Sequence, residues 1–540
     1  MQGRKDYNEK RITCFQLSSR IPKHNFYRRL KETLDLAFIY EATKQLYGPT
    51  GNPSIDPVVF FKFMLIGCLE NITSDRKLIE HCSLRMDMLY FLGYNIDEPL
   101  PWHSTLSRTR QLYPEALFEL VFDKVFSLCV ANNMVAGRRV AIDSAPVKAN
   151  ASMERLLEKQ PNVPGPKLVQ SVEDQNGAVD SIPKPSNRQA ASVITAADHQ
   201  LRRLKKHQQN LKSAPTTLGA SNEKAQLLSN KTHYSPTDPD ARISIKPGKA
   251  RKLNYHCSLA VDTAEGVISH VQADFADGRD SQCLPDIALK LQQRLAHNEL
   301  RLEEILADTG YSNGSNYALL EQWKITSWIP VFGHYKPQIE GFPYDPEGDQ
   351  FTCSVGKRLP FKTFATHADG GWLKIYRADY QDCKQCPLKP TCVPKSQCRQ
   401  ITRTAYDPFY RRALERQQSR RGKRRKRLRQ RTVEPVLGSL VEYYGLRKVN
   451  VRGKAGAHKV MLMAAVAFNL KKYMKFTTKS TLSQAMALKV EWSLASQGTF
   501  LSFAVLFNSA SKRRRIHFCF YEQMDKKRCI KRSCATATNV

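Results

Sequence analysis

The sequence predicts an α/β protein in which a mixed sheet flanked by helices follows an all-helical N-terminal domain. Apolar residues recur at spacings of three and four between residues 25 and 135, which is typical of amphipathic helices. Between residues 138 and 334, short β-rich runs come first and then alternate with helical segments, which indicates antiparallel strands followed by parallel ones. Two stretches, about 151–250 and 335–405, interrupt this order and are interpreted as insertions.

The composition limits the class of partner. The 540 residues are 41% hydrophobic, enough for two or three domains with real cores. Lys and Arg number 84 against 50 Asp and Glu, and the resulting net charge of +34 attracts polyanions such as nucleic acid. The longest apolar runs, 460–470 and 500–507, fall short of the ~20 residues that a membrane span needs. We therefore expect nucleic acid, and no membrane, as the partner.

Two features predict the cellular compartment. The opening residues, MQGRKDYNEK, contain no apolar stretch of the kind found in secretory signals. Without such a signal, the 14 cysteines indicate reduced thiols, a few of which could bind metal, rather than a disulfide framework. The expected location is the cytoplasm.

The N-terminal region divides into an arm, residues 1–24, and a helical domain, residues 25–135. Asp56 and Ser74 are predicted to start helices, and Gly93 to stop one. A later short helix has a polar, arginine-bearing start that contains Arg108 and Arg110. Such a helix suits a helix-turn-helix lying on DNA. A plain helical bundle with a solvated charged face explains it equally well.

A carboxylate follows two of the predicted strands. Asp143 ends the run that contains Val140 and Ile142, and Asp308 directly follows Ala307 at the end of another apolar run. Sites in open α/β sheets form at the carboxyl ends of strands, so adjacent strands would place these carboxylates side by side. Their hard oxygen ligands suit Mg²⁺ or Mn²⁺. Taken singly, each aspartate is more often a turn or cap residue.

A third carboxylate is expected on a helix that crosses this edge of the sheet. Glu434 lies in the predicted first turn of a helix with an apolar stripe, where Pro435 is tolerated because early helical N–H groups have no partner within the helix. Glu442 on the same helix is its competitor. Eight residues place the two about 12 Å apart along the axis, so one metal pair cannot use both.

A basic run precedes Glu434. It holds nine Lys or Arg within Arg420–Arg431. One interpretation is that the run is a solvated or disordered segment with no binding role. Its position beside the predicted site favours contact with DNA phosphates. The candidate contacts are Arg424, Arg425, Lys426, Arg427, Arg429 and Arg431.

Clustered cysteines mark the second insertion. Cys383 and Cys386 form a CxxC pair, with Cys392 downstream and Cys353 upstream. Four thiolates in one segment could form a tetrahedral structural zinc site. Cys398 is a fifth candidate, which leaves the ligand assignment open.

Several of these segments together resemble the DDE transposases of bacterial insertion sequences, in particular the branch with a helical N-terminal domain before an RNase H-like core. The resemblance covers about residues 25–475 and lies in the motifs VAIDSAPVKAN, SPTDPDAR, YHCSLAVDT, GVISHVQADF, ILADTGYSNG, CKQCPLKPTC, TVEPVLGSL and RKVNVRGK, in the family's order. It implies that Asp143, Asp308 and Glu434 are the acidic triad of an RNase H-like catalytic domain spanning 138–475.

The family's glutamate helix often carries a Tyr–Arg–Glu–Lys signature, from which this chain departs. Gln430 stands where the arginine would fall and Val441 where the lysine would fall, so Arg429, Arg431 or Lys448 are the possible substitutes. The departure leaves room for a DNA-binding protein of transposase descent that no longer cuts. An RNase H-like host nuclease shares the carboxylate chemistry and is a further alternative.

The resemblance implies a reaction and its partners. Two Mg²⁺ or Mn²⁺ ions in a DDE site would activate water to free a 3′-OH at the element's end, and that hydroxyl would then attack target DNA. The partners would be double-stranded DNA, both terminal inverted repeats and target, bound by a homodimer or larger assembly at the bacterial nucleoid. The basic tail, residues 476–540, matches nothing in the family.

Overall fold

The computed structural model describes most of the chain. It covers residues 16–48, 54–161, 194–213, 227–244, 250–333, 335–366 and 371–497. The chain divides into two compact units, Met1–Tyr473 and Met474–Val540. Parts of the predicted N-terminal arm, first insertion and basic tail (1–15, 162–193, 498–540) lie outside the described residues. None of the helices in the described ranges is both long and apolar enough to cross a membrane.

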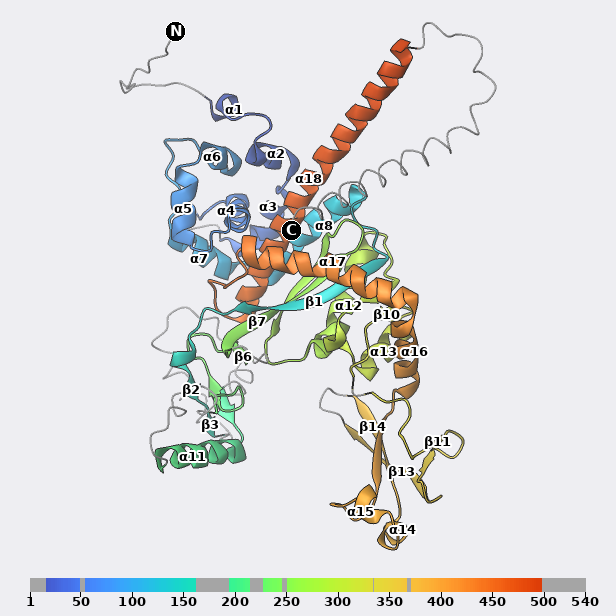
Figure 1. Ribbon diagram of the computed structural model, residues 1–540. Coiled ribbons are helices and arrows are strands. Elements are labelled where there is room, and N and C mark those ends of the chain that lie inside the picture. The colour runs from blue at the N-terminus through green and yellow to red at the C-terminus, as the bar shows by residue number, and fades with distance from the viewer. Residues whose placement is uncertain are drawn as a thin grey trace, which may run out of the picture. The chain divides into compact units, whose positions relative to one another are not determined.

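The N-terminal region is all-helical, as predicted (Figure 1, blue). Its helices are α1 (Leu17–Arg20), α2 (Phe26–Thr33), α3 (Phe38–Thr43), α4 (Pro57–Leu69), α5 (Asp75–Ser83), α6 (Met86–Leu92), α7 (His103–Leu112) and α8 (Glu115–Ala131), with a 3₁₀ turn at Lys44–Leu46. The Asp56 side chain accepts hydrogen bonds from two backbone amides of α4, and Ser74 caps α5 in the same way. Gly93 ends α6 at φ 95°, a left-handed conformation that glycine adopts without steric cost.

The main sheet is mixed, which confirms the predicted class. Its strands are β1 (Arg139–Lys148), β6 (Arg242–Ser244), β7 (Lys252–Asp262), β8 (Ile268–Phe275), β9 (Glu304–Leu306) and β10 (Thr326–Trp328). The order is β10-β9-β1-β7, with β6 and β8 both pairing with β7. Strand β7 pairs antiparallel with both β1 and β8, whereas β9 runs parallel to β1 and β10 runs parallel to β9.

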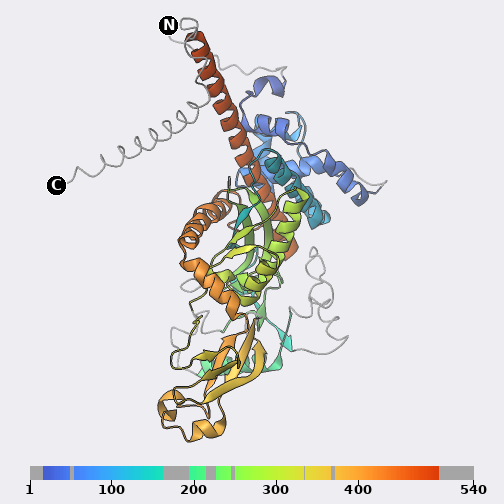
Figure 2. The same ribbon diagram turned by 90° about the vertical axis from the view of Figure 1, so that its right-hand side faces the viewer.

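Helices cover both faces of this sheet. Helices α12 (Asp280–His297) and α13 (Gly314–Gln322) provide the connections to the parallel strands β9 and β10. Helix α17 (Arg420–Tyr443) lies against β1 and β7 on the face opposite α12 (Figure 2). The alternation of strands and helices read from the sequence is therefore the one that the structure builds.

The first insertion differs in extent from its prediction. It contains a 3₁₀ turn (Met153–Arg155), four two-residue strands, namely β2 (Leu157–Glu158), β3 (Gln160–Pro161), β4 (Thr195–Ala196) and β5 (His233–Tyr234), and α11 (Asp198–Ser213). Helix α11 is polar, with the sequence DHQLRRLKKHQQNLKS. However, β6 was assigned to the insertion and instead pairs with β7 at the edge of the main sheet.

The second insertion forms its own sheet. Five antiparallel strands follow one another in space as they do in sequence: β11 (Tyr344–Asp345), β12 (Gln350–Thr352), β13 (Arg358–Thr366), β14 (Trp372–Arg377) and β15 (Gln400–Thr404). Short helices α14 (Tyr380–Lys384) and α15 (Lys389–Cys392) precede β15. Phe351, Leu359, Tyr376 and Ile401 form a small buried cluster that holds the sheet together.

The chain returns to the main sheet through α16 (Asp407–Gln418) and α17. A Cβ at Gly422 would lie 2.0 Å from the Arg416 carbonyl oxygen, so the sharp corner between the two helices requires glycine. Because α17 begins at Arg420, the basic run is itself helical, and Pro435 lies in the helix interior rather than in its first turn as predicted. Helix α18 (Lys454–Gln497) continues past residue 476, where the sequence showed no pattern.

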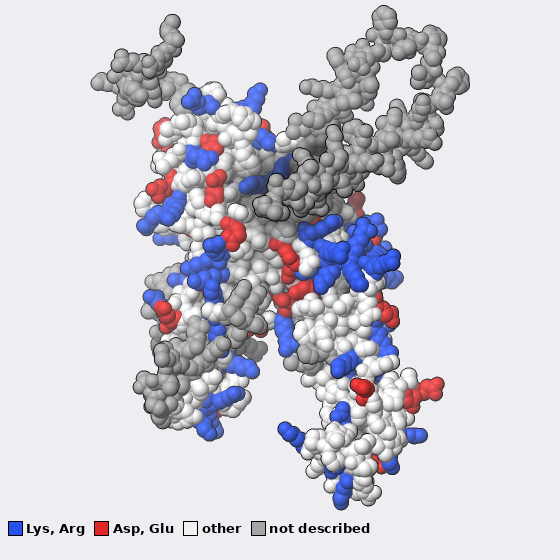
Figure 3. Space-filling view, viewed as in Figure 1, with Lys and Arg blue, Asp and Glu red and all other residues white. Residues whose placement is uncertain are grey.

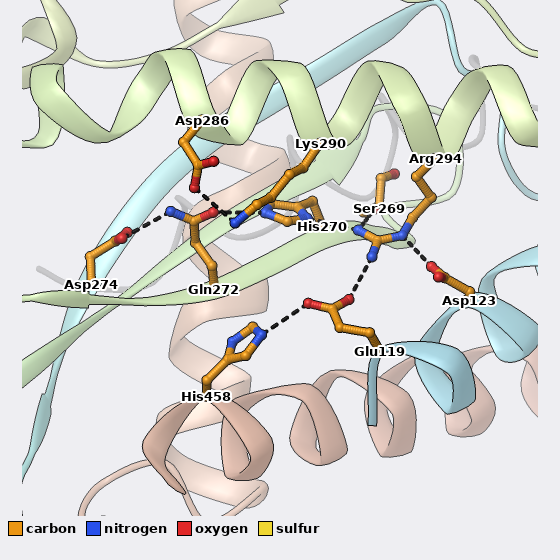
Figure 4. A network of polar contacts seen from close by, with 10 residues as sticks. All are labelled: Glu119, Asp123, Ser269, His270, Gln272, Asp274, Asp286, Lys290, Arg294 and His458. Atoms are coloured by element: carbon orange, nitrogen blue, oxygen red, sulfur yellow. Dashed lines mark hydrogen bonds and ion pairs between the residues drawn. The ribbon is translucent and has the colours of Figure 1, made fainter. Parts of the chain in front are cut away.

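A network of polar contacts joins the helical region to the sheet (Figure 4). Arg294 on α12 donates hydrogen bonds to Glu119 at 2.7 Å and to Asp123, both on α8. It also donates to Nδ1 of His270 at 2.7 Å, so the His270 ring donates through Nε2 to Gln272. Burial, assisted by the charge of Arg294, lowers the pKa of His270 to about 3, which keeps the ring neutral.

The tail is expected to be dispensable for folding of the first unit. Among the residues whose burial is described, which end at Thr478, the last buried apolar residue is Met474, and the first compact unit ends at Tyr473. We expect truncation after Lys475 to leave a chain that expresses in soluble form and unfolds cooperatively, as followed by circular dichroism. Aggregation of the truncated chain would show that the residues after 475 contribute to this core.

Candidate active site

The register of the sheet places Asp143 and Asp308 next to each other. In the parallel pair of β1 and β9, Ala141 lies opposite Leu306, and each aspartate follows two residues later. Asp143 was predicted to end its strand, but β1 continues to Lys148 because β7 pairs with it over that whole length. The site is therefore at the point where β9 ends and β1 loses its parallel neighbour.

A third carboxylate, Asp280 at the start of α12, belongs to this cluster. Ser144 donates a hydrogen bond to its Oδ1 at 2.6 Å. A Cβ at Gly310 would lie 3.1 Å from both Asp280 Oδ2 and Asp308 Oδ1, so the two carboxylates face the same small space. Sequence reasoning missed Asp280. The sequence signal that could have found Asp280 is its position, because it starts the helix that directly follows the antiparallel strands.

The electrostatics of the cluster favour a cation. Burial raises the pKa of Asp143, and Asp308 adds to the increase while Arg429 opposes it. Burial also raises the pKa of Asp308, with Asp280 adding to it. The buried Tyr311 hydroxyl lies among the same carboxylates, and its pKa is raised well above the ordinary value by burial and by their charges. The negative charge of this site is thus only partly compensated by the protein.

Arg429 connects the aspartates to the glutamate helix. Its guanidinium donates to Asp143 Oδ2 at 2.7 Å and to Glu434 Oε1 at 3.0 Å. Arg429 is buried, whereas the Glu434 side chain is 51% exposed. Of the three basic residues considered as substitutes for the missing signature arginine, Arg429 is therefore the one that contacts the glutamate.

The donor set suits a hard divalent cation because buried carboxylate oxygens in mutual repulsion gain most from such an ion. In the described part of the chain, no three His, Cys, Asp or Glu side chains converge as a ready-made metal site. At the acidic site, the guanidinium of Arg429 lies between Asp143 and Glu434, and this is why the carboxylates of these two residues do not converge.

The basic run is divided between two faces of α17. Arg425 donates to Glu304 at 3.0 Å, and Arg429 is buried, so these two do not lie open to a DNA backbone as predicted. Of the predicted contacts in the run, Arg424, Lys426, Arg427 and Arg431 are exposed. Figure 3 shows a dense group of basic side chains over this helix. The inward positions 425 and 429 continue the buried stripe at Val433 with a spacing of four.

The two DNA contacts predicted in the helical domain, Arg108 and Arg110, differ in their exposure to solvent. Arg110 is 8% exposed and donates to Asp75 at 2.7 Å, so its role is structural and the expectation of a DNA contact is corrected. Arg108 is exposed on the same helix. Arg110 follows Arg108 by two residues, which is a rotation of about 200° around the helix axis, so the two side chains lie on opposite faces of the helix.

The predicted zinc ligands do not assemble. Cys353, Cys383, Cys386 and Cys392 are all free thiols, and no metal-binding group forms among the described residues. Cys353 and Cys383 instead pack against the apolar cluster of the second insertion. The spare candidate, Cys398, is buried and accepts a hydrogen bond from Arg377 at 2.9 Å. Cys353 and Cys383 therefore contribute to a small core, and the four predicted ligands do not form a metal-binding group among the described residues.

Glu442 lies apart from the acidic cluster. Its side chain is half exposed and pairs with Arg447. The motif SPTDPDAR is also separate from the cluster. Within it, Asp238 accepts hydrogen bonds from the Tyr255 hydroxyl at 2.7 Å and from the Gly453 amide at 3.1 Å, which fixes the start of α18.

The fold and the site define an α/β protein with an acidic centre at the carboxyl end of a parallel strand, beside a basic helix. Two family models match the chain: a transposase domain (DUF772) over residues 15–112 and a transposase DDE domain over residues 352–474. The chain therefore carries a transposase domain and a transposase DDE domain, which support its assignment as a DDE transposase. The second match includes Glu434 and the second insertion from residue 352 onward.

Other comparisons add little to this assignment. No curated protein matches the chain. A cryo-EM structure of a piggyBac transposase synaptic complex with hairpin DNA aligns with 84% of this chain and 74% of its own chain. The sequence identity is 9% and the TM-score is 0.27, so the family assignment rests on the two domain matches.

Proposed function

We propose that this protein cleaves the ends of an insertion sequence and joins them to target DNA, with Asp143, Asp308 and Glu434 as the acidic triad. The observation that carries the proposal is the convergence of Asp143 and Asp308 at one point of the sheet, with Arg429 linking Glu434 to them. We further propose an RNase H-like core. Its support is the mixed sheet, with three antiparallel strands followed by two parallel ones.

The three acidic residues would hold Mg²⁺ or Mn²⁺. Divalent metal at such a site polarises the phosphate and activates the attacking hydroxyl. Asp143 and Asp308 are positioned by strand pairing, so their carboxylates need little rearrangement. Glu434 is on a helix and half exposed, and it is held toward Asp143 by Arg429. Arg429 would thereby orient the glutamate toward the aspartates.

The exposed basic face of α17 would bind the DNA backbone. We expect Ala at Arg424, Lys426 and Arg427 together to lower the slope of log affinity against log salt by up to about 3, because each phosphate contact contributes about 0.9. Fluorescence anisotropy over a salt series measures this slope. The matched control is Arg425→Ala, which removes a residue already paired with Glu304. An equal slope in the triple variant and the parent chain would assign the basic face to solvent.

A second function is favoured by the Arg429 contact. A protein of transposase descent that binds DNA without cutting could keep a permanent ion pair where metal would otherwise bind. Incubation of the chain with Mg²⁺ and a plasmid carrying the inverted repeats that flank its gene tests the choice. Cleavage at the repeat ends supports the transposase. Binding of the repeats without cleavage supports the second function, and cleavage independent of the repeats would indicate a host nuclease.

The proposed partners are double-stranded repeat and target DNA, bound by a homodimer or larger assembly in the bacterial cytoplasm. The family assignment and the exposed basic face of α17 support DNA as the partner. Light scattering of the chain with repeat DNA measures the assembly.

A further inference from the structure

An open groove of about 1640 Å³ adjoins the acidic site. One wall belongs to the core and contains Asp280 and Gly310, the residues beside the carboxylate cluster. The other wall belongs to the second insertion and contains Tyr344 and Trp372. The groove exceeds the roughly 300–1,000 Å³ of a typical small-molecule pocket, which indicates an extended ligand.

The base of the groove is closely packed. A Cβ at Gly314 would lie 2.6 Å from the Tyr406 side chain, so the end of the insertion packs directly on the backbone of α13. The rings of Tyr335 and Tyr410 stack with centroids 4.9 Å apart, and the Tyr335 hydroxyl donates to Asp407 at 2.9 Å. These contacts hold the insertion wall against the core wall.

The walls combine aromatic and cationic groups. Phe332 and Trp372 are 53% and 49% exposed, and both line the groove. Arg279 and Lys336 are also exposed in the groove. The Arg403 guanidinium lies 3.6 Å from the centroid of the Tyr344 ring, and a base could extend that stack.

We propose that this groove binds unpaired nucleotides of the DNA strand that passes through the acidic site. Aromatic faces bind bases whose own faces are free, and a duplex hides these faces in its stack. The basic side chains would contact the phosphates of the same strand, and that strand would continue to Asp308 because the next two residues, Thr309 and Gly310, line the groove. The inference rests on the proposed function in that DNA is the substrate, and it assigns the second insertion a role.

The test measures binding by the full-length chain in EDTA, where cleavage plays no part. Two labelled DNAs are compared by anisotropy: a blunt duplex, and the same duplex with a single-stranded tail of about ten nucleotides. We expect the tailed DNA to bind about tenfold more tightly, and Phe332→Ala with Trp372→Ala to reduce this ratio to near one while duplex binding is unchanged. Tyr380→Ala, equally exposed in the same insertion but outside the groove, should keep the ratio.

Two results would overturn the proposal. One is equal affinity of the parent chain for tailed and blunt DNA. The other is a double variant, folded by circular dichroism, that keeps the preference or loses affinity for both DNAs alike. Because no cleavage is measured, a chain that binds tails but never cuts repeat ends would refute the proposed reaction and leave the groove assignment standing.

Discussion

Glu434→Gln should abolish Mg²⁺-dependent cleavage of element ends, lowering the rate by roughly 10³-fold, while leaving DNA affinity intact. The substitution keeps the shape of the side chain and its contact with Arg429 but removes the charge that would hold metal. Asp143→Asn and Asp308→Asn should have the same effect, since their carboxylates lie side by side at the end of β9. Gel assays of cleavage and binding on the same DNA separate the two properties.

Glu442→Gln is the matched control on the same helix. Glu442 pairs with Arg447 at the surface, and exposed ion pairs of this kind contribute little to stability. We expect this variant to keep most of the cleavage activity. Loss of cleavage at position 442 together with full activity at position 434 would show that the helix presents a different glutamate to the site.

Arg294→Met should destabilise the protein by about 2–3 kcal/mol, because it leaves Glu119 and Asp123 on α8 without their shared cation. The Arg294 side chain is 10% exposed, but its partners are 27% and 43% exposed, so solvent screens part of the loss. The substitution also removes the donor to His270. Urea-induced unfolding, followed by circular dichroism, measures the change.

Lys290→Met provides the control one turn earlier on α12 (Figure 4). Lys290 pairs with Asp286 at 2.9 Å, but both side chains are about half exposed, so its loss should cost no more than about 0.5 kcal/mol. If the two variants unfold at the same urea concentration, the network around Arg294 does not stabilise the junction between the helical region and the sheet.

The sequence by itself predicted the parts of the fold that depend on neighbouring residues. Helix starts at Asp56 and Ser74, the left-handed stop at Gly93 and the alternation of strands and helices are all local patterns, and the structure builds each of them. The proximity of Asp143 and Asp308 was also predictable, since it needs only adjacent parallel strands ending at the same level.

The tertiary structure decided which of several equivalent side chains face the site. Nine basic residues of one run look alike in sequence, yet Arg429 alone of the predicted contacts turns to Asp143, a residue 286 positions away. Arg110, Cys353 and Cys383 likewise have partners set by packing, and the predicted DNA contact of Arg110 was corrected. Such choices depend on contacts between distant segments, and a helix's periodicity does not specify which partner its inward face will meet.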